Sequence, residues 1–250
     1  MDKSVLKQIA ETYGTPVVIY DEGKIIENYA SLKSALPPNS QVVYSVKANP
    51  NPGVISVLNK CGAYFESASE GEYDLLLRTG IRPGRILFSG QAKSKQGILR
   101  AIDDGVFLFN IESMREALLL RDCSNKKHIK TKFLLRINPS LSENNAVLHM
   151  GSKPSPFGVD EEDVPNILEY VNHSDTRCVG FFMYNGSQYY DSKDIAMNTN
   201  YLCEFAMKMQ REKQAEIHYL DFGGGFGVVE NTTQVPLDLS ELQQNLKNNE

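Results

Sequence analysis

Short apolar runs alternate with helical patterns along most of the chain, and this alternation limits the folds that it can adopt. The apolar runs, which we expect to be strands, lie at residues 41–48, 63–69, 85–90, 105–111, 131–139, 177–186 and 216–225. Helical patterns lie between them at residues 52–62, 69–80, 94–105, 112–122, 161–173 and 198–213. Strands that alternate with helices form right-handed βαβ units around a parallel sheet. Because no linker or low-complexity tract interrupts the series, the sequence predicts one α/β domain over residues 1–250.

The number of strands leaves two architectures open. Seven parallel strands fit an open, doubly wound sheet, and they also fit a (β/α)8 TIM-type barrel that lacks one strand. Residues 238–250 have the pattern of the helix that should follow the seventh strand. An intact barrel closes with an eighth strand, which removes the unpaired edges of the sheet. The choice between the two architectures depends on where the functional motifs fall.

Composition and charge exclude several classes of protein. The 250 residues are 41% hydrophobic and 23% charged, and acidic and basic residues are interspersed, with a net charge of −5. This distribution offers no basic surface for a nucleic acid, and no apolar run approaches the roughly 20 residues that span a bilayer. Cys61, Cys123, Cys178 and Cys203 do not have the spacing of zinc ligands or of a disulfide framework. We expect a cytoplasmic protein that binds a small molecule and has no metal site.

The first strand contains a lysine whose position needs an explanation. In "QVVYSVKANP" (residues 41–50), side chains alternate between two faces, so that Val43, Ser45 and Lys47 share the face that points into a barrel. Active sites of such barrels lie at the C-terminal ends of the strands, which is where Lys47 falls. A desolvated lysine at such a position can act as an imine-forming nucleophile. The alternative is a solvated lysine at the junction of strand and loop.

A glycine-rich turn follows the seventh strand. "LDFGGGFG" (residues 220–227) contains three consecutive glycines, Gly223, Gly224 and Gly225. Glycines allow several backbone N–H groups to crowd around one anion. In (β/α)8 barrels the turns after the seventh and eighth strands commonly bind phosphate. The turn therefore predicts a phosphate site, with a flexible structural turn as the alternative.

Other candidate residues lie near the C-terminal ends of strands or in loops. Tyr184 could cover a flat heterocycle at the barrel mouth, and the Ser187 hydroxyl could bind phosphate; an ordinary core aromatic residue and a turn are the alternatives. Glu66 and Arg136 lie inside apolar strands, so they should pair with each other or contact a ligand. His149 lies in a loop and could be a ligand contact or simply exposed.

Together these features indicate one cofactor, pyridoxal 5'-phosphate, which needs a lysine, a phosphate cradle and a group that holds its ring. The motifs "YSVKAN", "FESASEGE", "HMGSKPSPFGV", "GFFMYNGSQ" and "LDFGGGFG" also resemble those of a known family, in the same order. The family is the fold-type III pyridoxal-phosphate decarboxylases, which include diaminopimelate and ornithine decarboxylases and, more distantly, alanine racemase. The opening "YGTPVVIYDEGKIIENYASLK" is similar too, so the resemblance covers nearly the whole chain.

The resemblance implies a role for most of the candidate residues. Lys47 matches the lysine that forms the internal aldimine with the cofactor. Residues 223–225 match the main phosphate-binding turn, and Ser187 matches a further phosphate contact. Glu66 and Arg136 match polar positions near the cofactor.

One position departs from the family pattern. Tyr184 matches a position where many members place a histidine stacked on the pyridine ring. The loop "MGSKPSPFGV" is similar to branches that serve siderophore or antibiotic-like biosynthesis, some of which act on carrier-bound substrates.

The resemblance also implies an activity and a larger architecture. Members remove the α-carboxylate of an amino acid, so the expected substrate is diaminopimelate-like or carrier-bound. In the family an eighth strand, a Glu-Pro-Gly-Arg segment and a C-terminal β-domain follow, and the full-length form is a homodimer. None of these segments lies within residues 1–250, so we expect a (β/α)8 barrel that is truncated before strand eight. An amino-acid racemase, a non-catalytic pyridoxal-phosphate binding protein and a degenerate remnant remain as alternatives.

Overall fold

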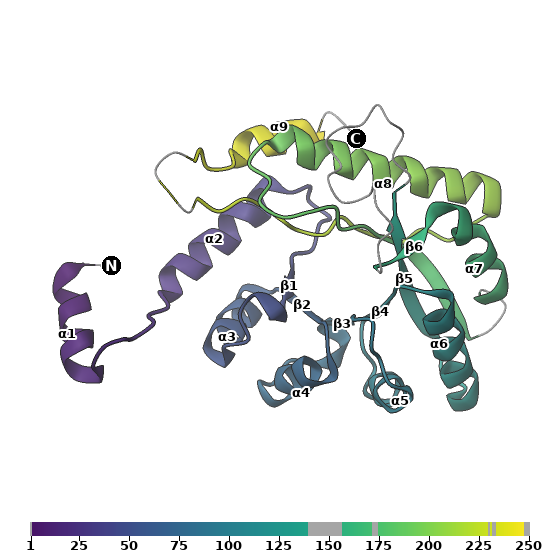
Figure 1. Cartoon of the computed structure of the whole chain (residues 1–250), viewed down its shortest axis with the longest axis horizontal. Helices are drawn as coiled ribbons and strands as arrows, with labels where there is room; N and C mark the ends of the chain where they lie inside the picture. Colours follow the sequence, from purple (N-terminus) through teal and green to yellow (C-terminus); the bar gives the residue numbers. More distant parts are fainter. Residues whose placement is uncertain (1, 140–156, 172–174, 230, 232–233, 248–250) are drawn as a thin grey trace.

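The chain forms a curved sheet with helices around it, in a computed structural model that describes residues 2–139, 157–171, 175–229, 231 and 234–247 (Figure 1). The strands are β1 (Val43–Ser45), β2 (Tyr64–Ser67), β3 (Ile86–Phe88), β4 (Leu108–Ile111), β5 (Thr131–Asn138), β6 (Val159–Asp160), β7 (Thr176–Phe182) and β8 (Tyr219–Asp221). The helices are α1 (Lys3–Tyr13), α2 (Glu22–Ala35), α3 (Pro52–Cys61), α4 (Glu70–Arg78), α5 (Lys95–Asp104), α6 (Met114–Lys127), α7 (Val164–Val171), α8 (Ser192–Lys213) and α9 (Leu239–Lys247). Short 3-10 turns are η1 (Val46–Ala48), η2 (Pro83–Arg85) and η3 (Glu161–Asp163).

All the strands that the sequence predicts lie in one parallel sheet. Their order is β1-β2-β3-β4-β5-β7-β8, so neighbours in the sheet are also neighbours along the chain, apart from the short β6 between β5 and β7. A doubly wound sheet reverses its order at a switch point, whereas a (β/α) barrel does not, so the prediction of a barrel is confirmed. The short strand β6, which the sequence did not predict, pairs with the end of β5 through Val159 and Ile137. Among the described residues, β1 and β8 form the two edges of the sheet.

Period-two alternation sorts the strand side chains into two apolar layers. Phe65, Ile86 and Phe109 belong to the main core, which lies between the sheet and the helices. The inner face of the sheet carries a second cluster, made of Leu87, Leu108, Leu134, Val179 and Phe182. Neighbours such as Ile86 and Leu87 therefore belong to different layers, as expected for strands covered on both faces.

Local side-chain signals set the boundaries of the helices. Ser69 caps α4 and Ser113 caps α6, and each hydroxyl accepts a hydrogen bond from the backbone N–H three residues later, at Glu72 and Glu116. These are the serine and glutamate positions of a capping box. At the C-terminus of α3, Gly62 adopts a left-handed conformation with φ of 96°, which glycine tolerates best.

The helix α9 connects the two ends of the helical series. It packs against both α8 and α2, and the Gln243 side chain donates a hydrogen bond to the backbone carbonyl of Ser34. The ring of helices is therefore continuous from the last helix to the first long one. In contrast, α1 lies apart from the sheet and buries none of its residues (Figure 1).

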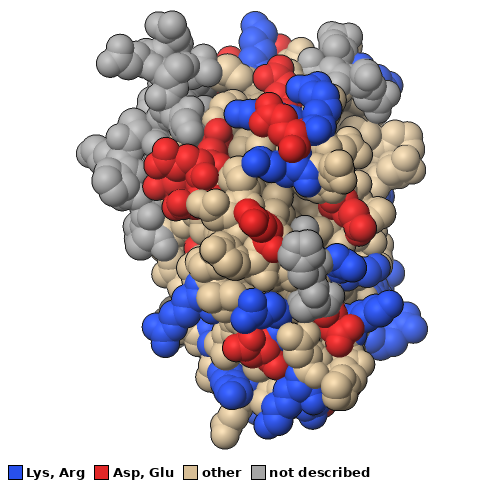
Figure 2. Space-filling model, turned by 90° about the vertical axis from the view of Figure 1, so that its right-hand side faces the viewer, with Lys and Arg blue, Asp and Glu red and all other residues tan. Residues whose placement is uncertain are grey.

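The surface carries both signs of charge. Figure 2 shows acidic and basic side chains interspersed over the face at the right of Figure 1, in agreement with the sequence. Within the described ranges, no helix is long and apolar enough to cross a membrane.

Candidate functional site

Lys47 lies at the C-terminal end of β1, but not within a strand. β1 ends at Ser45, and Lys47 lies in the turn η1 that follows, so the prediction of a strand to residue 48 is wrong. The reason is that β1, an edge strand among the described residues, pairs there with β2 alone, and this ladder ends at the pair Ser45–Glu66. The turn buries Val46 and leaves Lys47 exposed. The Lys47 Nζ nevertheless lies 5.8 Å from the centroid of the Tyr184 ring, within the range of a cation–π contact.

Tyr184 connects two of the residues that the sequence singled out. It follows β7 and packs on the inner apolar cluster. Its hydroxyl hydrogen-bonds the Ser187 hydroxyl, with 2.7 Å between the two oxygens. Since Lys47 lies over the ring and Ser187 at the hydroxyl, the structure brings all three predicted residues to one place. Ser187 is exposed there.

The glycine turn packs directly against the turn that contains Ser187. Gly223 and Gly225 have φ angles of 69° and 81°, which disfavour side chains. A Cβ on Gly225 would lie 2.2 Å from the backbone carbonyl oxygen of Gly186. The Tyr189 N–H also donates to the Gly225 carbonyl at 2.8 Å. The two turns therefore form one unit, as a shared phosphate site requires.

The middle glycine of the turn differs from its neighbours. A Cβ on Gly224 would meet no atom within 4 Å, and its φ angle is outside the left-handed range. The fold itself therefore does not require a glycine at this position. Open space beside consecutive backbone N–H groups is the arrangement that a bound anion needs.

A cluster of charged groups lies on the same side of the barrel. Asp221 ends β8, and its Oδ1 accepts a hydrogen bond from the Gly223 N–H at 2.8 Å. Burial, followed by the nearby charge of Glu66, raises the pKa of Asp221 to about 7. The Gly223 hydrogen bond and the positive charge of Arg136 oppose this shift. Glu66 and Arg136 are therefore both close enough to influence Asp221, although the three residues come from different strands.

The ion-pair partner of Arg136 is Glu112, not Glu66. Arg136 Nη1 lies 3.3 Å from Glu112 Oε2, and the two side chains are 13% and 7% exposed. The guanidinium also lies 5.0 Å from the ring centroid of Phe157 and 5.2 Å from that of Phe182. Of the two alternatives for Glu66 and Arg136, the mutual pair is therefore wrong, because Glu112, which directly follows the neighbouring strand β4, takes that place. That position, an acid immediately after a buried strand, is the signal that could have identified Glu112. Contact of Glu66 and Arg136 with a ligand stays a prediction.

Sequence reasoning also missed a buried ion pair between Lys93 and Glu116. Their Nζ and Oε1 atoms are 3.1 Å apart, and the side chains are 1% and 10% exposed. Burial lowers the pKa of Lys93 and raises that of Glu116, and the opposite charge of each partner counteracts the shift of the other. The pair is therefore mutually dependent, since removal of one partner leaves a buried charge. Lys93 lies in a polar loop and has no pattern that would have indicated its burial.

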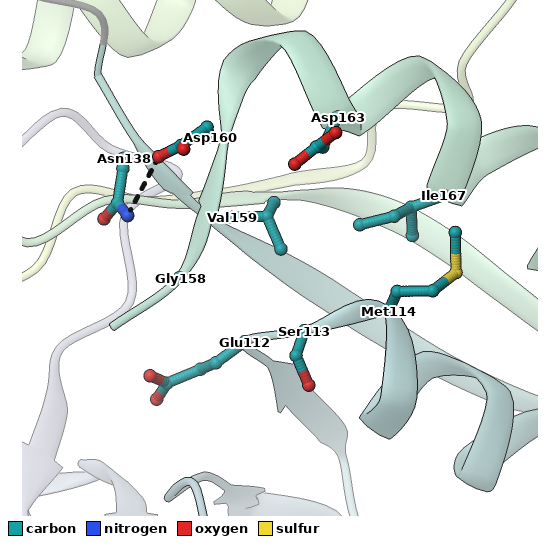
Figure 3. Close-up of a pocket in the computed structure, with 9 residues that line it drawn as sticks. All are labelled: Glu112, Ser113, Met114, Asn138, Gly158, Val159, Asp160, Asp163 and Ile167. Atoms are coloured by element: carbon teal, nitrogen blue, oxygen red, sulfur yellow. Dashed lines mark hydrogen bonds between the residues drawn. The ribbon is translucent and has the colours of Figure 1, made fainter. Parts of the chain in front are cut away.

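A cavity of about 310 Å³ lies beside Glu112 (Figure 3). It is lined by Glu112, Ser113, Met114, Asn138, Gly158, Val159, Asp160, Asp163 and Ile167. The close-up shows that the lining comes from the end of β4, the start of α6, the last residue of β5 and the segment that leads through β6 to α7. Asn138 and Asp160 are joined by a hydrogen bond of 3.4 Å at one end of it.

His149, which the sequence offered as a possible ligand contact, lies outside the described residues.

Comparison with known proteins agrees with the motifs. Residues 22–249 match the family described as "Pyridoxal-dependent decarboxylase, pyridoxal binding domain". Diaminopimelate decarboxylase from Aquifex aeolicus is 30% identical over 249 residues, which are 98% of this chain and 59% of that protein. L-glutamyl-[BtrI acyl-carrier protein] decarboxylase from Niallia circulans is 26% identical over 243 residues, 97% of this chain and 57% of that protein. The chain thus spans about three fifths of the length of these curated relatives.

Solved structures of similar proteins have the same fold. Diaminopimelate decarboxylase from Helicobacter pylori, crystallised with L-lysine, gives a TM-score of 0.86 at 26% identity, over 97% of this chain and 62% of that one. The enzyme from M. jannaschii, also with L-lysine, gives 0.88 at 25% identity, over 97% and 58%. The predicted fold and the predicted pyridoxal cofactor are confirmed by these matches. The chain belongs to the pyridoxal-dependent decarboxylase family, with its pyridoxal-binding domain at residues 22–249.

Proposed function

We propose that this chain forms the pyridoxal-phosphate site of an amino-acid decarboxylase, with Lys47 as the covalent anchor. The observation that carries the proposal is the convergence of Lys47 and Tyr184 from opposite parts of the sheet, 5.8 Å apart from Nζ to ring centroid. The glycine turn lies beside them, because it packs against the turn of Ser187, whose hydroxyl hydrogen-bonds the Tyr184 hydroxyl. An amine, a flat ring and an anion cradle in one place are the three elements that this cofactor needs.

Each of these residues has a distinct part in binding. Bound pyridoxal phosphate supplies an aldehyde that condenses with amines and a ring that accepts the electron pair released when a carboxylate leaves. Lys47 provides the amine, and Tyr184 provides an aromatic surface for the ring. The N–H groups of Gly224 and Gly225 and the hydroxyl of Ser187 would hold the phosphate, while the Gly223 N–H is engaged by Asp221 within the turn. Gly224 keeps the space for the phosphate free of a side chain.

Charged residues near the C-terminal ends of β2, β5 and β8 complete the site. Arg136 contributes a guanidinium held between Glu112 and two aromatic rings. Glu66 contributes a carboxylate, and Asp221 contributes a carboxyl that holds a proton below a pH of about 7. Ser45 adds a buried hydroxyl without a hydrogen-bond partner in the described part of the chain. A cofactor with a phenolic oxygen, a ring nitrogen and a phosphate suits this mixture of donors and acceptors.

The substrate of the full-length protein is an amino acid whose α-carboxylate is removed. The named relatives act on free diaminopimelate or on a glutamyl group bound to a carrier protein, so these two are the substrates to test. Release of carbon dioxide from either one by a protein containing this chain supports the decarboxylase. Racemisation without carbon dioxide supports the racemase, and cofactor attachment without either reaction supports a binding protein.

Attachment of the cofactor to Lys47 is the direct test. The full chain is mixed with pyridoxal phosphate, reduced with borohydride, digested and analysed by mass spectrometry. The expected result is the mass of the reduced cofactor on the peptide containing Lys47, and no such adduct on the same peptide from Lys47→Ala. Lys60→Ala is the matched control, because Lys60 is an exposed lysine on the adjacent helix α3 with 72% of its side chain exposed. Equal labelling of Lys60 and Lys47 contradicts a specific site.

The quaternary state and location are further parts of the proposal. The full-length protein is expected to be a cytoplasmic homodimer, as the family resemblance implies. Analytical ultracentrifugation of the full-length protein tests the dimer, and a monomer over the whole concentration range contradicts it. Cell fractionation tests the location.

A further inference from the structure

Lys93 is a buried lysine that has no part in the cofactor contacts proposed above. It lies in the loop between β3 and α5, with 1% of its side chain exposed. Its ammonium group donates to the backbone carbonyl of Gly90 and to Glu116 Oε1. Burial of an ammonium group is costly unless partners compensate. An apolar side chain would suit this space better if filling it were the only task.

The two carboxylate oxygens of Glu116 connect Lys93 to the end of β4. Oε1 receives the Lys93 ammonium at 3.1 Å, and Oε2 accepts the backbone N–H of Glu112 at 2.8 Å. The ion pair therefore fixes the carboxylate that holds the peptide of Glu112 in place. Because both oxygens are engaged, a shift of Lys93 is transmitted to the residue that follows β4.

An equivalent turn in the same sheet shows that capping alone does not need a lysine. After β2, Glu72 accepts the N–H of Ala68 at 2.7 Å, and Ser69 caps α4 as Ser113 caps α6. Within the described ranges, Glu72 forms no ion pair. The same local geometry is therefore built without a buried cation. The two turns differ in the residue whose N–H the glutamate accepts. After β2 that residue is Ala68, whereas after β4 it is Glu112, which pairs with Arg136.

Glu112, held in place by Glu116, in turn forms an ion pair with Arg136. Their side chains are 7% and 13% exposed, with 3.3 Å between Oε2 and Nη1. The guanidinium lies close to the rings of Phe157 and Phe182 as well, so the carboxylate and the two rings together restrict its orientation. These contacts thus connect the loop after β3 to the inner face of β5, in the order Lys93–Glu116–Glu112–Arg136.

We propose that Lys93 is a positioning residue that acts through Glu116 and Glu112 to fix the guanidinium of Arg136 at the cofactor site. The inference rests on the proposed function for its consequence, which is tighter binding of pyridoxal phosphate. The fixed geometry itself belongs to the free chain. A guanidinium that is already oriented loses less freedom when a ligand binds.

The first experiment measures Arg136 in the chain without cofactor. The Arg136 Nε–H resonance is observed by nitrogen-15 NMR and assigned by its loss in Arg136→Met. Lys93→Met alone leaves an unpaired buried carboxylate, so the variant to use is the neutral double change Lys93→Met with Glu116→Gln. The expected result is a shift of the resonance toward the positions of exposed arginines. An unchanged resonance in the folded double variant overturns the proposal.

The second experiment asks whether Lys93 acts through Arg136. The double variant is expected to weaken pyridoxal-phosphate binding about tenfold, as is usual for coupling within one network. In the Arg136→Met background the same double change should have no further effect. Independent losses in the two backgrounds, which multiply, contradict action through Arg136 and indicate a merely structural role.

A matched control separates this network from general loss of ion pairs. Lys127→Met with Asp103→Asn removes the 2.6 Å ion pair between α6 and α5. It should leave both the Arg136 resonance and cofactor binding unchanged. If the wild-type chain does not bind pyridoxal phosphate at all, the proposed function fails, while the Arg136 resonance still tests the positioning of Arg136 independently.

Discussion

The Lys47 ammonium lies 5.8 Å from the centroid of the Tyr184 ring, although Lys47 follows β1 and Tyr184 follows β7. β1 is one edge of the sheet, and β7 is next to the other edge. In a flat sheet these positions would be far apart, since neighbouring strands are spaced by roughly 4.8 Å. The contact therefore depends on the curvature of the barrel. The predictions below test the groups that this curvature brings together.

The first prediction concerns the ring of Tyr184. Tyr184→Phe keeps the aromatic surface and should retain the affinity for pyridoxal phosphate within about threefold, whereas Tyr184→Leu should lose about tenfold, because aromatic contacts contribute roughly 0.5–1.5 kcal/mol beyond buried area. The two dissociation constants are measured by absorbance titration. Equal affinities for Leu and Phe at this position would show that the ring does not hold the cofactor.

The second prediction compares two adjacent glycines. Gly224→Ala should change the free energy of unfolding by less than about 0.5 kcal/mol, because its Cβ meets no atom within 4 Å. It should still abolish cofactor binding, because the methyl group occupies the anion space. Gly225→Ala should cost more than about 1–2 kcal/mol, because of its positive φ and the clash with Gly186. Urea unfolding and cofactor titration of both variants check this; a Gly224→Ala chain that binds normally contradicts the phosphate site.

The third prediction concerns the pH dependence that Asp221 introduces. Its folded-state pKa of about 7 is above the ordinary value, so the folded chain binds this proton more strongly than the unfolded chain. The contribution of Asp221 to stability is therefore complete at low pH and is lost as the pH rises from about 4 to about 7. Asp221→Asn keeps the oxygen that accepts from Gly223 but removes the titration.

The measurement is urea unfolding of both chains at pH 5 and pH 8. The Asn variant should match the wild type at pH 5 more closely than at pH 8. At pH 8 it should be more stable by an amount on the order of 1–4 kcal/mol, at about 1.4 kcal/mol per pKa unit. A wild type that is as stable as Asp221→Asn at pH 8, or more stable, would contradict the raised pKa of Asp221.

The fourth prediction tests the close approach of β7 and β8. A Cβ on Gly180 would lie 1.7 Å from the Tyr219 carbonyl oxygen, so Gly180→Ala should separate the two strands and also weaken cofactor binding by displacing the turn after β8. Gly80→Ala is the control, because Gly80 has a φ of 83° but open space around its Cβ position. Its cost should be about 1–2 kcal/mol from backbone strain alone. Equal losses of unfolding free energy in the two variants would show that strain, not the strand contact, matters at Gly180.

The sequence by itself determined the repeating architecture and named most of the residues of the candidate site. The seven apolar runs became the strands of one sheet because their period and flanking turns are local properties of the chain. The glycine turn and Ser187 were recognisable for the same reason, since backbone freedom and hydroxyl chemistry are fixed by residue type. Lys47 was identified on the correct side of the barrel, although β1 ends before it.

The tertiary structure decided which charged groups meet. Whether Arg136 pairs with Glu66 or Glu112 depends on how β5 packs beside β4, and no local pattern contains that information. The burial of Lys93 and the raised pKa of Asp221 likewise depend on the surroundings that distant segments provide. Coulomb interactions and desolvation are set by distances and enclosure in space. The sequence could therefore name the chemical groups, while only the packing of strands and loops in space determined their partners.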